Sequence, residues 1–366
     1  MHRAAPTSEP RHARPGASAL AFAAALLVVG CERGGDLREA TIEAAGGEVH
    51  VVVRSADAAR VDAALAEART GVAAREAEWH SWHPSALTTI NAAFRRGESA
   101  PAPATVLRLI ERSRAFAKAS DGLLDPAVGD LVQLWGFHAD HFPLSSPAPA
   151  KATVGQWLAS RPRLEQVRVD GDRVTTSNPR VQLDFNAILE GETATALAAL
   201  LQRHGLRDAR LELGGDTAVL GDAGGTPWRV GFKDPYGGEL GSVALADGEA
   251  FFTSGNYDKF RPSTSGGRWG HVLDPRTGMP ARGAAATAVL SDDAVLADAA
   301  STALMVGGPS AFARLVRQLG VGCALMVTEE NELLITTAMR KRMDFARHPI
   351  PLGAAVDAGG DCRAPK

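Results

Sequence analysis

The sequence has few cysteines, few aromatic residues and no strong excess of either charge, and each shortage excludes a class of protein. Three cysteines in 366 residues cannot define a disulfide scaffold, and no Cys or His residues have zinc-site spacing. The 39 Lys and Arg residues nearly balance the 42 Asp and Glu residues, so no basic stripe indicates a nucleic-acid partner. Neither a Walker loop nor a Gly-x-Gly-x-x-Gly after an apolar strand is present, so the common nucleotide-site signatures are missing.

What is present is an ordinary globular composition, with 45% hydrophobic and 22% charged residues, which is enough for a sizeable core. The first apolar run, Ala17 to Val29, follows three arginines and stops at Gly30-Cys31. It is too short to span a membrane comfortably. We therefore interpret residues 1–30 as a secretory signal.

The end of this run, Val28-Val29-Gly30-Cys31, resembles a bacterial lipobox, in which the cysteine becomes the lipidated first residue of the mature chain. Acyl chains contribute about 0.8 kcal/mol for each buried CH₂ group, so several of them hold a soluble domain at a membrane surface. We expect an exported protein that is lipid-anchored to a bacterial membrane and faces the periplasm. The alternative is a plain signal peptide or short anchor in which Cys31 is incidental.

The rest of the chain divides into three parts. Residues 31–45 are polar and glycine-containing and are predicted to form a tether, residues 46–345 a single domain, and residues 346–366 a polar tail. Within the domain, apolar residues at helical spacing predict a helix over Asp57 to Trp79. Cys323 lies in an apolar run and Cys362 in the tail. A disulfide between them is permitted in an oxidising compartment, but we favour two separate thiols.

The most informative stretch runs from Phe251 to Pro280. It begins with an apolar strand that ends in Thr253-Ser254-Gly255, followed by Tyr257. It then continues as His271-Val272-Leu273-Asp274-Pro275-Arg276-Thr277-Gly278-Met279-Pro280, in which Pro and Gly are typical of tight turns. A single His beside such a turn is usually structural, but the combination of motifs is unusual.

Thr-Ser-Gly-x-Tyr followed by His-x-x-Asp-Pro-x-Thr-Gly-x-Pro resembles the ApbE family of FAD:protein FMN transferases. Four further segments match in the family's order, so the likeness covers roughly Gly46 to Met343. Members of the family move FMN from FAD onto a Ser or Thr of another protein, with Mg²⁺. The resemblance implies an α+β fold: one T-fold-like domain with antiparallel sheets and flanking helices.

The resemblance also implies which residues bind FAD. Trp82 takes the position of an aromatic that stacks on the isoalloxazine ring, which suits a flat tricycle. Asp125 contacts the flavin end, whereas Asp184 and Glu190 hold the adenosine end. Many members have Lys where this chain has Glu190, and an acid near a diphosphate repels it unless it faces the ribose or adenine. The other FAD-binding residues implied are Leu123, Leu124, Gly214, Gly215, Asp216, Thr253, Ser254, Gly255 and Leu273.

A magnesium site is expected at the start of a late helix. Asp298 and Thr302 are four residues apart, which places a carboxylate and a hydroxyl on one helical face. A bare Asp-x-x-x-Thr usually has no such role, but the surrounding Ala-Asp-Ala-x-x-Thr-Ala resembles the family's metal segment. The backbone carbonyl of Ala187 would complete the ligand set, and oxygen donors of this kind suit Mg²⁺.

The reaction implied is attack of an acceptor hydroxyl on the FMN-side phosphorus of FAD, with release of AMP. Either His271 or Asp274 takes the hydroxyl proton, and the sequence does not choose between them. The expected partner is an acceptor flavoprotein with a Ser/Thr flavinylation motif, and this chain carries no such motif itself. Two alternatives remain: an FAD pyrophosphatase that forms FMN and AMP, and a flavin-binding lipoprotein without catalysis.

Overall fold

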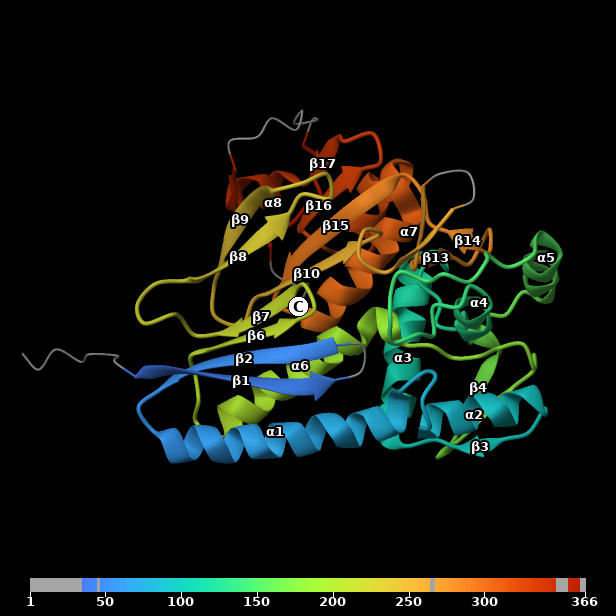
Figure 1. The fold of residues 1–366 in the computed structure, drawn as a ribbon, viewed down its shortest axis with the longest axis horizontal. Coiled ribbons are helices and arrows are strands. Elements are labelled where there is room, and N and C mark those ends of the chain that lie inside the picture. The colour runs from blue at the N-terminus through green and yellow to red at the C-terminus, as the bar shows by residue number, and fades with distance from the viewer. Residues whose placement is uncertain (1–34, 45–46, 264–266, 347–354, 363–366) are drawn as a thin grey trace, which may run out of the picture. The chain divides into compact units, whose positions relative to one another are not determined.

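An eight-stranded antiparallel sheet runs through the described chain in the order β1-β2-β6-β7-β10-β15-β16-β17 (Figure 1). The computed structural model describes residues 35–44, 47–263, 267–346 and 355–362. The strands of this sheet are β1 (Asp36–Ala44), β2 (Gly47–Ser55), β6 (Ala209–Leu213), β7 (Asp216–Leu220), β10 (Ala250–Gly255), β15 (Ala284–Ser291), β16 (Cys323–Thr328) and β17 (Leu333–Ile335).

Eight α-helices are described. They are α1 (Ala58–Trp79), α2 (Ala86–Arg95), α3 (Ala104–Ala119), α4 (Gly129–Leu134), α5 (Lys151–Ser160), α6 (Asn186–Arg203), α7 (Ala294–Gln318) and α8 (Thr337–Arg342). The helix predicted over Asp57 to Trp79 is confirmed as α1. It begins after Asp57 because the Asp57 carboxylate caps it by accepting a 3.0 Å hydrogen bond from the amide of Arg60. Helix α7 is kinked at Gly308, where φ is +66° and Pro309 follows. No helix in the described ranges is long and apolar enough to cross a membrane.

Four smaller sheets are also described, of which two have three strands and two are two-stranded hairpins. One has the order β18 (Met343–Phe345), β9 (Glu239–Leu245), β8 (Trp228–Lys233), and another β3 (Ala100–Pro101), β5 (Arg173–Thr176), β4 (Val167–Asp170). A 3-10 turn at Leu164–Gln166 precedes β4. Two short hairpins join β11 (Phe260–Pro262) to β12 (Arg268–Gly270) and β13 (Leu273–Asp274) to β14 (Met279–Pro280). The hairpins extend away from the main sheet toward the region of α4 and α5 (Figure 1).

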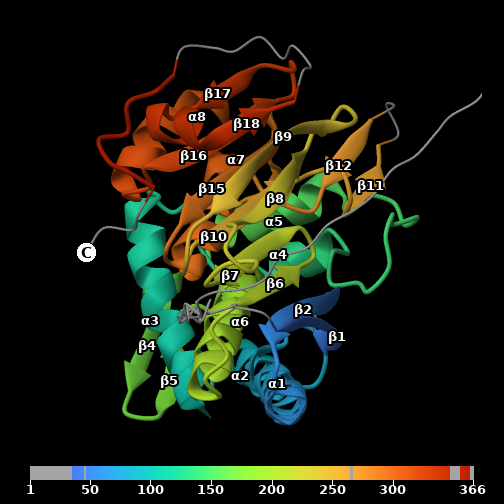
Figure 2. The same ribbon diagram turned by 90° about the vertical axis from the view of Figure 1, so that its left-hand side faces the viewer.

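Both faces of the main sheet are covered, because alternate side chains of a strand point to opposite faces. On β10, Phe252 packs into the core formed with α1, α3, α6 and α7, whereas Phe251 packs into a second core formed with β8, β9 and α8. Figure 2 shows α1 and α6 on one side of the strands and β8 and β9 on the other. The predicted α+β class, with antiparallel sheets and flanking helices, is confirmed.

Three expectations about the ends of the domain need correction. The tether predicted for residues 31–45 is wrong for Asp36–Ala44, which form edge strand β1 and pair along their whole length with β2. The tail is not a free polar segment either, because Val356 forms a β-bridge with Thr336. Cys323 and Cys362 are not separate thiols: they form a disulfide that fastens the tail to β16. Residues 1–34, including Cys31, lie outside the described ranges.

Candidate active site

A cavity of about 500 Å³ lies where the ends of β7 and β10 meet the first turns of α6 and α7. It collects nearly all of the residues expected at a binding site, although they are spread from Trp82 to Thr302 in the sequence. Those that line it are Trp82, Leu123, Leu124, Asp125, Asp184, Ala187, Glu190, Gly214, Gly215, Asp216, Thr253, Ser254, Gly255, His271, Leu273, Asp298 and Thr302. Asp274 does not line it.

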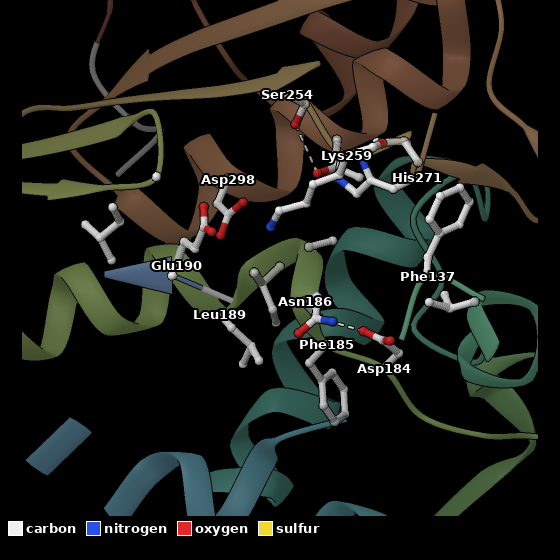
Figure 3. Close-up of a pocket in the computed structure, with 18 of the residues that line it drawn as sticks. Phe137, Asp184, Phe185, Asn186, Leu189, Glu190, Ser254, Lys259, His271 and Asp298 are labelled. Carbon is white, nitrogen blue, oxygen red and sulfur yellow. Dashed lines mark hydrogen bonds between the residues drawn. The ribbon is translucent and has the colours of Figure 1, made fainter. Parts of the chain in front are cut away.

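Three acidic side chains meet on one wall of this cavity. The Asp298 carboxylate, 6% exposed, accepts a 2.9 Å hydrogen bond from the amide of Gly191. Asp216 accepts hydrogen bonds from the amide of Thr253 at 2.6 Å and from its hydroxyl at 3.1 Å. Burial raises the pKa values of both aspartates well above their usual range, and the negative charge of Glu190 raises them further. Figure 3 shows the carboxylates of Glu190 and Asp298 side by side.

The other oxygen atoms near this wall that could bind a metal ion belong to hydroxyl and carbonyl groups. Ser254 Oγ lies 2.8 Å from Ser301 Oγ and 3.3 Å from Thr302 Oγ1. Among the described residues, no three His, Cys, Asp or Glu side chains are grouped so as to hold a metal ion. A cation here would therefore use one carboxylate with hydroxyl and carbonyl oxygens, which is the donor chemistry that Mg²⁺ accepts.

His271 presents one ring nitrogen for chemistry because the other is engaged. Its backbone amide donates to the carbonyl of Lys259 at 3.0 Å, and its Nδ1 lies 3.2 Å from the same oxygen. A carbonyl can only accept, so Nδ1 carries the hydrogen and Nε2 keeps its lone pair. Burial lowers the pKa of His271 to about 4, and the nearby Lys259 charge lowers it further, so the ring is neutral at neutral pH.

Asp274, the other candidate base, is engaged elsewhere. Its carboxylate accepts hydrogen bonds from Arg276, including one of 2.8 Å from the guanidinium and one of 2.8 Å from the amide. The ion pair raises the pKa of Arg276. Because Asp274 is 7% exposed and outside the cavity wall, it stabilises the β13–β14 hairpin, and the geometry favours His271 as the base.

Trp82 belongs to a chain of contacts at the aromatic end of the cavity. Its ring stacks on His138 at a centroid distance of 5.3 Å and an angle of 19°, and His138 Nε2 lies 2.8 Å from Asp184 Oδ2. The Trp82 indole also donates to Asp140 at 3.2 Å. Trp82 and Asp184 are therefore linked through His138, and the roles expected for them at the flavin and adenosine ends of FAD stay predictions.

The Asp125 carboxylate is occupied by backbone groups. It accepts hydrogen bonds from the amides of Ala127 at 2.9 Å and Leu164 at 3.1 Å. Burial raises its pKa, so these two donors offset only part of the cost of desolvation. Asp125 thus fixes the loop that carries Leu123 and Leu124. The expected contact of its carboxylate with the flavin stays a prediction.

Lys259 and Tyr257 line the cavity but were not predicted from the sequence. Lys259 is the one Lys or Arg among the described residues of the cavity wall. Its side chain points from the loop after β10 toward Glu190 and Asp298 (Figure 3). The only available signal was its position two residues after Tyr257 in the Thr-Ser-Gly-Asn-Tyr-Asp-Lys run. A lone lysine in a loop has no characteristic spacing, so the signal was weak.

Comparison with known proteins gives consistent matches. A family model described as "ApbE family" matches residues 45–326. A curated relative from Rhodobacter capsulatus, named FAD:protein FMN transferase, is 40% identical over 280 residues, which cover 76% of this chain and 53% of that protein. A relative of the same name from Salmonella typhimurium is 32% identical over 218 residues, covering 58% of this chain and 62% of its own length. The match thus spans little more than half of these relatives.

Among solved structures, the crystal structure of an ApbE protein from Thermotoga maritima superposes with a TM-score of 0.74 and 27% sequence identity. The superposition covers 84% of this chain and all of that one. The fold is therefore shared over most of the described domain.

Proposed function

Because the chain belongs to the ApbE family, we propose that it is an FAD:protein FMN transferase, which moves FMN from FAD onto a Thr or Ser hydroxyl of an acceptor protein and releases AMP. The observation that carries the proposal is the single cavity into which the family's separate segments bring their polar residues. The name of the Rhodobacter capsulatus relative supports the same activity.

The reaction exchanges the phosphoanhydride bond of FAD for a phosphoester bond to the acceptor. The acceptor oxygen bonds to the FMN-side phosphorus of FAD, the bond from that phosphorus to the bridging oxygen breaks, and AMP leaves with the electron pair. The hydroxyl proton passes to Nε2 of His271, which is neutral and held in place by the Lys259 carbonyl. Its low pKa keeps this nitrogen available as an acceptor at neutral pH.

The cavity wall fits a divalent cation. Asp298 and Asp216 are buried close to Glu190, and burial together with the negative charge of Glu190 raises the pKa of both carboxyl groups. A bound divalent cation would favour their ionised form. The Asp298 carboxylate, the Thr302 hydroxyl and the Ala187 carbonyl would hold Mg²⁺, which when bound neutralises charge on the diphosphate. The fit rests on the oxygen donors of this wall.

We further propose that the mature protein is exported and held at a membrane by a lipid on Cys31. The support comes from the sequence before Cys31, which lies outside the described residues, and from the Cys323–Cys362 disulfide. Disulfides persist in oxidising compartments and are rare in the cytosol. A periplasmic location meets both conditions.

The decisive experiment uses purified protein without residues 1–30, FAD, Mg²⁺ and an acceptor domain that bears a Ser/Thr flavinylation motif. We expect covalent FMN on the acceptor, seen as yellow fluorescence in a denaturing gel, with one AMP formed for each labelled acceptor. An acceptor with Ala at the target position is the control. FMN and AMP without a labelled acceptor would mean that the protein is a pyrophosphatase, and intact FAD would mean that it is a binder.

A further inference from the structure

The cavity wall is strongly acidic for a site that is to hold an anion. Besides Glu190, Asp216 and Asp298, the wall includes Glu48, Glu76, Asp140, Asp184 and Asp258. FAD carries two negative charges on its diphosphate, so entry into such a site is unfavourable unless cations lie close to the phosphates. One divalent ion offsets part of this charge. A cation supplied by the protein itself would offset more.

Lys259 is placed to supply that cation. It is the one Lys or Arg among the described residues that line the cavity, and its half-buried side chain extends toward Glu190 and Asp298 (Figure 3). It forms no ion pair within 4.0 Å with any described residue, so its ammonium is not already neutralised by a single partner. A strongly hydrated ammonium of this kind is a suitable ligand for phosphate oxygens.

The backbone of Lys259 has a separate task. Its carbonyl accepts the amide and Nδ1–H of His271, so the same residue orients the proposed base. The carbonyl is present whatever the side chain, and a side-chain substitution therefore removes the ammonium while leaving the contacts to His271. This separation makes the role of the charge testable.

Building on the proposed function, we propose that Lys259 is a phosphate-binding residue, whose ammonium contacts the diphosphate of FAD beside the carboxylates of Glu190 and Asp298. It selects ligands that carry phosphate over those that carry only the isoalloxazine ring. The acid Glu190 in the same wall makes this selection depend on Lys259 and on a divalent ion.

The test measures binding in EDTA and in Mg²⁺, without acceptor, for Lys259→Met, Lys259→Arg and the unmutated protein. We expect Lys259→Met to weaken the binding of FAD about tenfold or more, as for loss of a charge-assisted contact. The binding of riboflavin should weaken less than about twofold. Lys259→Arg should retain most of the FAD affinity. Lys233→Met is the matched control, because Lys233 lies 3.9 Å from Asp258 and 5.1 Å from the Tyr257 ring but outside the cavity wall.

Each outcome bears on the proposal. Equal FAD affinity in Lys259→Met and the unmutated protein would overturn it, and so would equal losses of FAD and riboflavin, which indicate a distorted loop. If Lys259→Met melts at a lower temperature, Lys259→Gln is measured in its place by the same criteria. The proposed function fails separately: binding that depends on Lys259 with no acceptor labelling rejects the transferase, and labelling with unchanged affinity in Lys259→Met rejects only the role of the lysine.

Discussion

The Asp298 carboxylate on α7 accepts a 2.9 Å hydrogen bond from the backbone amide of Gly191 on α6. A side chain at Gly191 would prevent this contact, because a Cβ atom there would lie 2.6 Å from the carbonyl oxygen of Ala294 and 2.7 Å from Cα of Val295. The two helices therefore touch through their backbones. This close approach holds a buried carboxylate against the cavity.

Asp298→Asn should separate charge from structure. The amide oxygen still accepts from Gly191, while the charge that Glu190 repels is gone, so the melting temperature in EDTA should stay equal or rise. Mg²⁺ should no longer raise it, and FMN transfer should fall about 100-fold or more, the scale of one lost electrostatic contact to a transition state. Calorimetry measures the melting temperature, and the gel assay measures FMN transfer. Full-rate transfer by the unmutated protein in EDTA would contradict the metal site.

Trp82→Ala should weaken FAD binding. Loss of stacking and burial costs on the order of 1 kcal/mol, or about fivefold in affinity. Trp82→Phe keeps an aromatic face and is the control. Unchanged affinity in both variants would point instead to Trp79, which is 3% exposed and also lines the cavity.

His271 should make stability depend on pH. Its pKa is about 4 in the folded protein and about 6.5 in the unfolded chain, so between these values only the unfolded chain takes up the proton. The free energy of unfolding is therefore lost as pH falls from 6.5 to 4. His271→Gln should show a smaller loss over this window, measured by urea titration at several pH values, and no transfer. Identical pH profiles for the two proteins would refute the low pKa.

The Cys323–Cys362 disulfide should contribute to stability. It closes a loop with a sequence separation of 39, and a bridge of this size contributes roughly 2–4 kcal/mol. Cys362→Ser should lower the free energy of unfolding by that amount and move the urea midpoint to a lower concentration. Dithiothreitol should do the same to the unmutated protein and have no effect on the variant. Equal midpoints with and without reductant would show that the bridge is absent in solution.

Cys31→Ser should release the protein from the membrane. The unmutated protein should sediment with membranes and yield an acylated Cys31 in mass spectrometry, because the apolar run ends there. The variant should appear in the soluble fraction after osmotic shock. A variant that remains membrane-bound to the same extent would favour an uncleaved signal that acts as an anchor.

Local chemistry explains what could be predicted from the sequence. The helical spacing after Asp57 identified α1, and of the site residues that the motif segments identified, all but Asp274 line the cavity. These signals are carried by neighbouring residues. They do not require knowledge of which distant elements meet.

What could not be predicted depends on long-range pairing. β1 was missed because it is an exposed edge strand with many polar residues, a composition that is also typical of a tether. Only its pairing with β2 distinguishes the two. The pairing of Cys323 with Cys362 depends on where the tail docks. The ion pair of Asp274 with Arg276 and the direction of the Lys259 side chain could not be predicted for the same reason, because both are properties of the folded chain.

The scatter of the cavity residues along the chain has a consequence for flavin supply. The wall extends from Ala44 at the end of β1 to Thr302 in α7, so no fragment that ends before α7 contains the site. A chain that crosses a membrane unfolded therefore cannot carry FAD with it. If this protein folds outside the cytoplasm and acts as proposed, its FAD must be delivered there by another route.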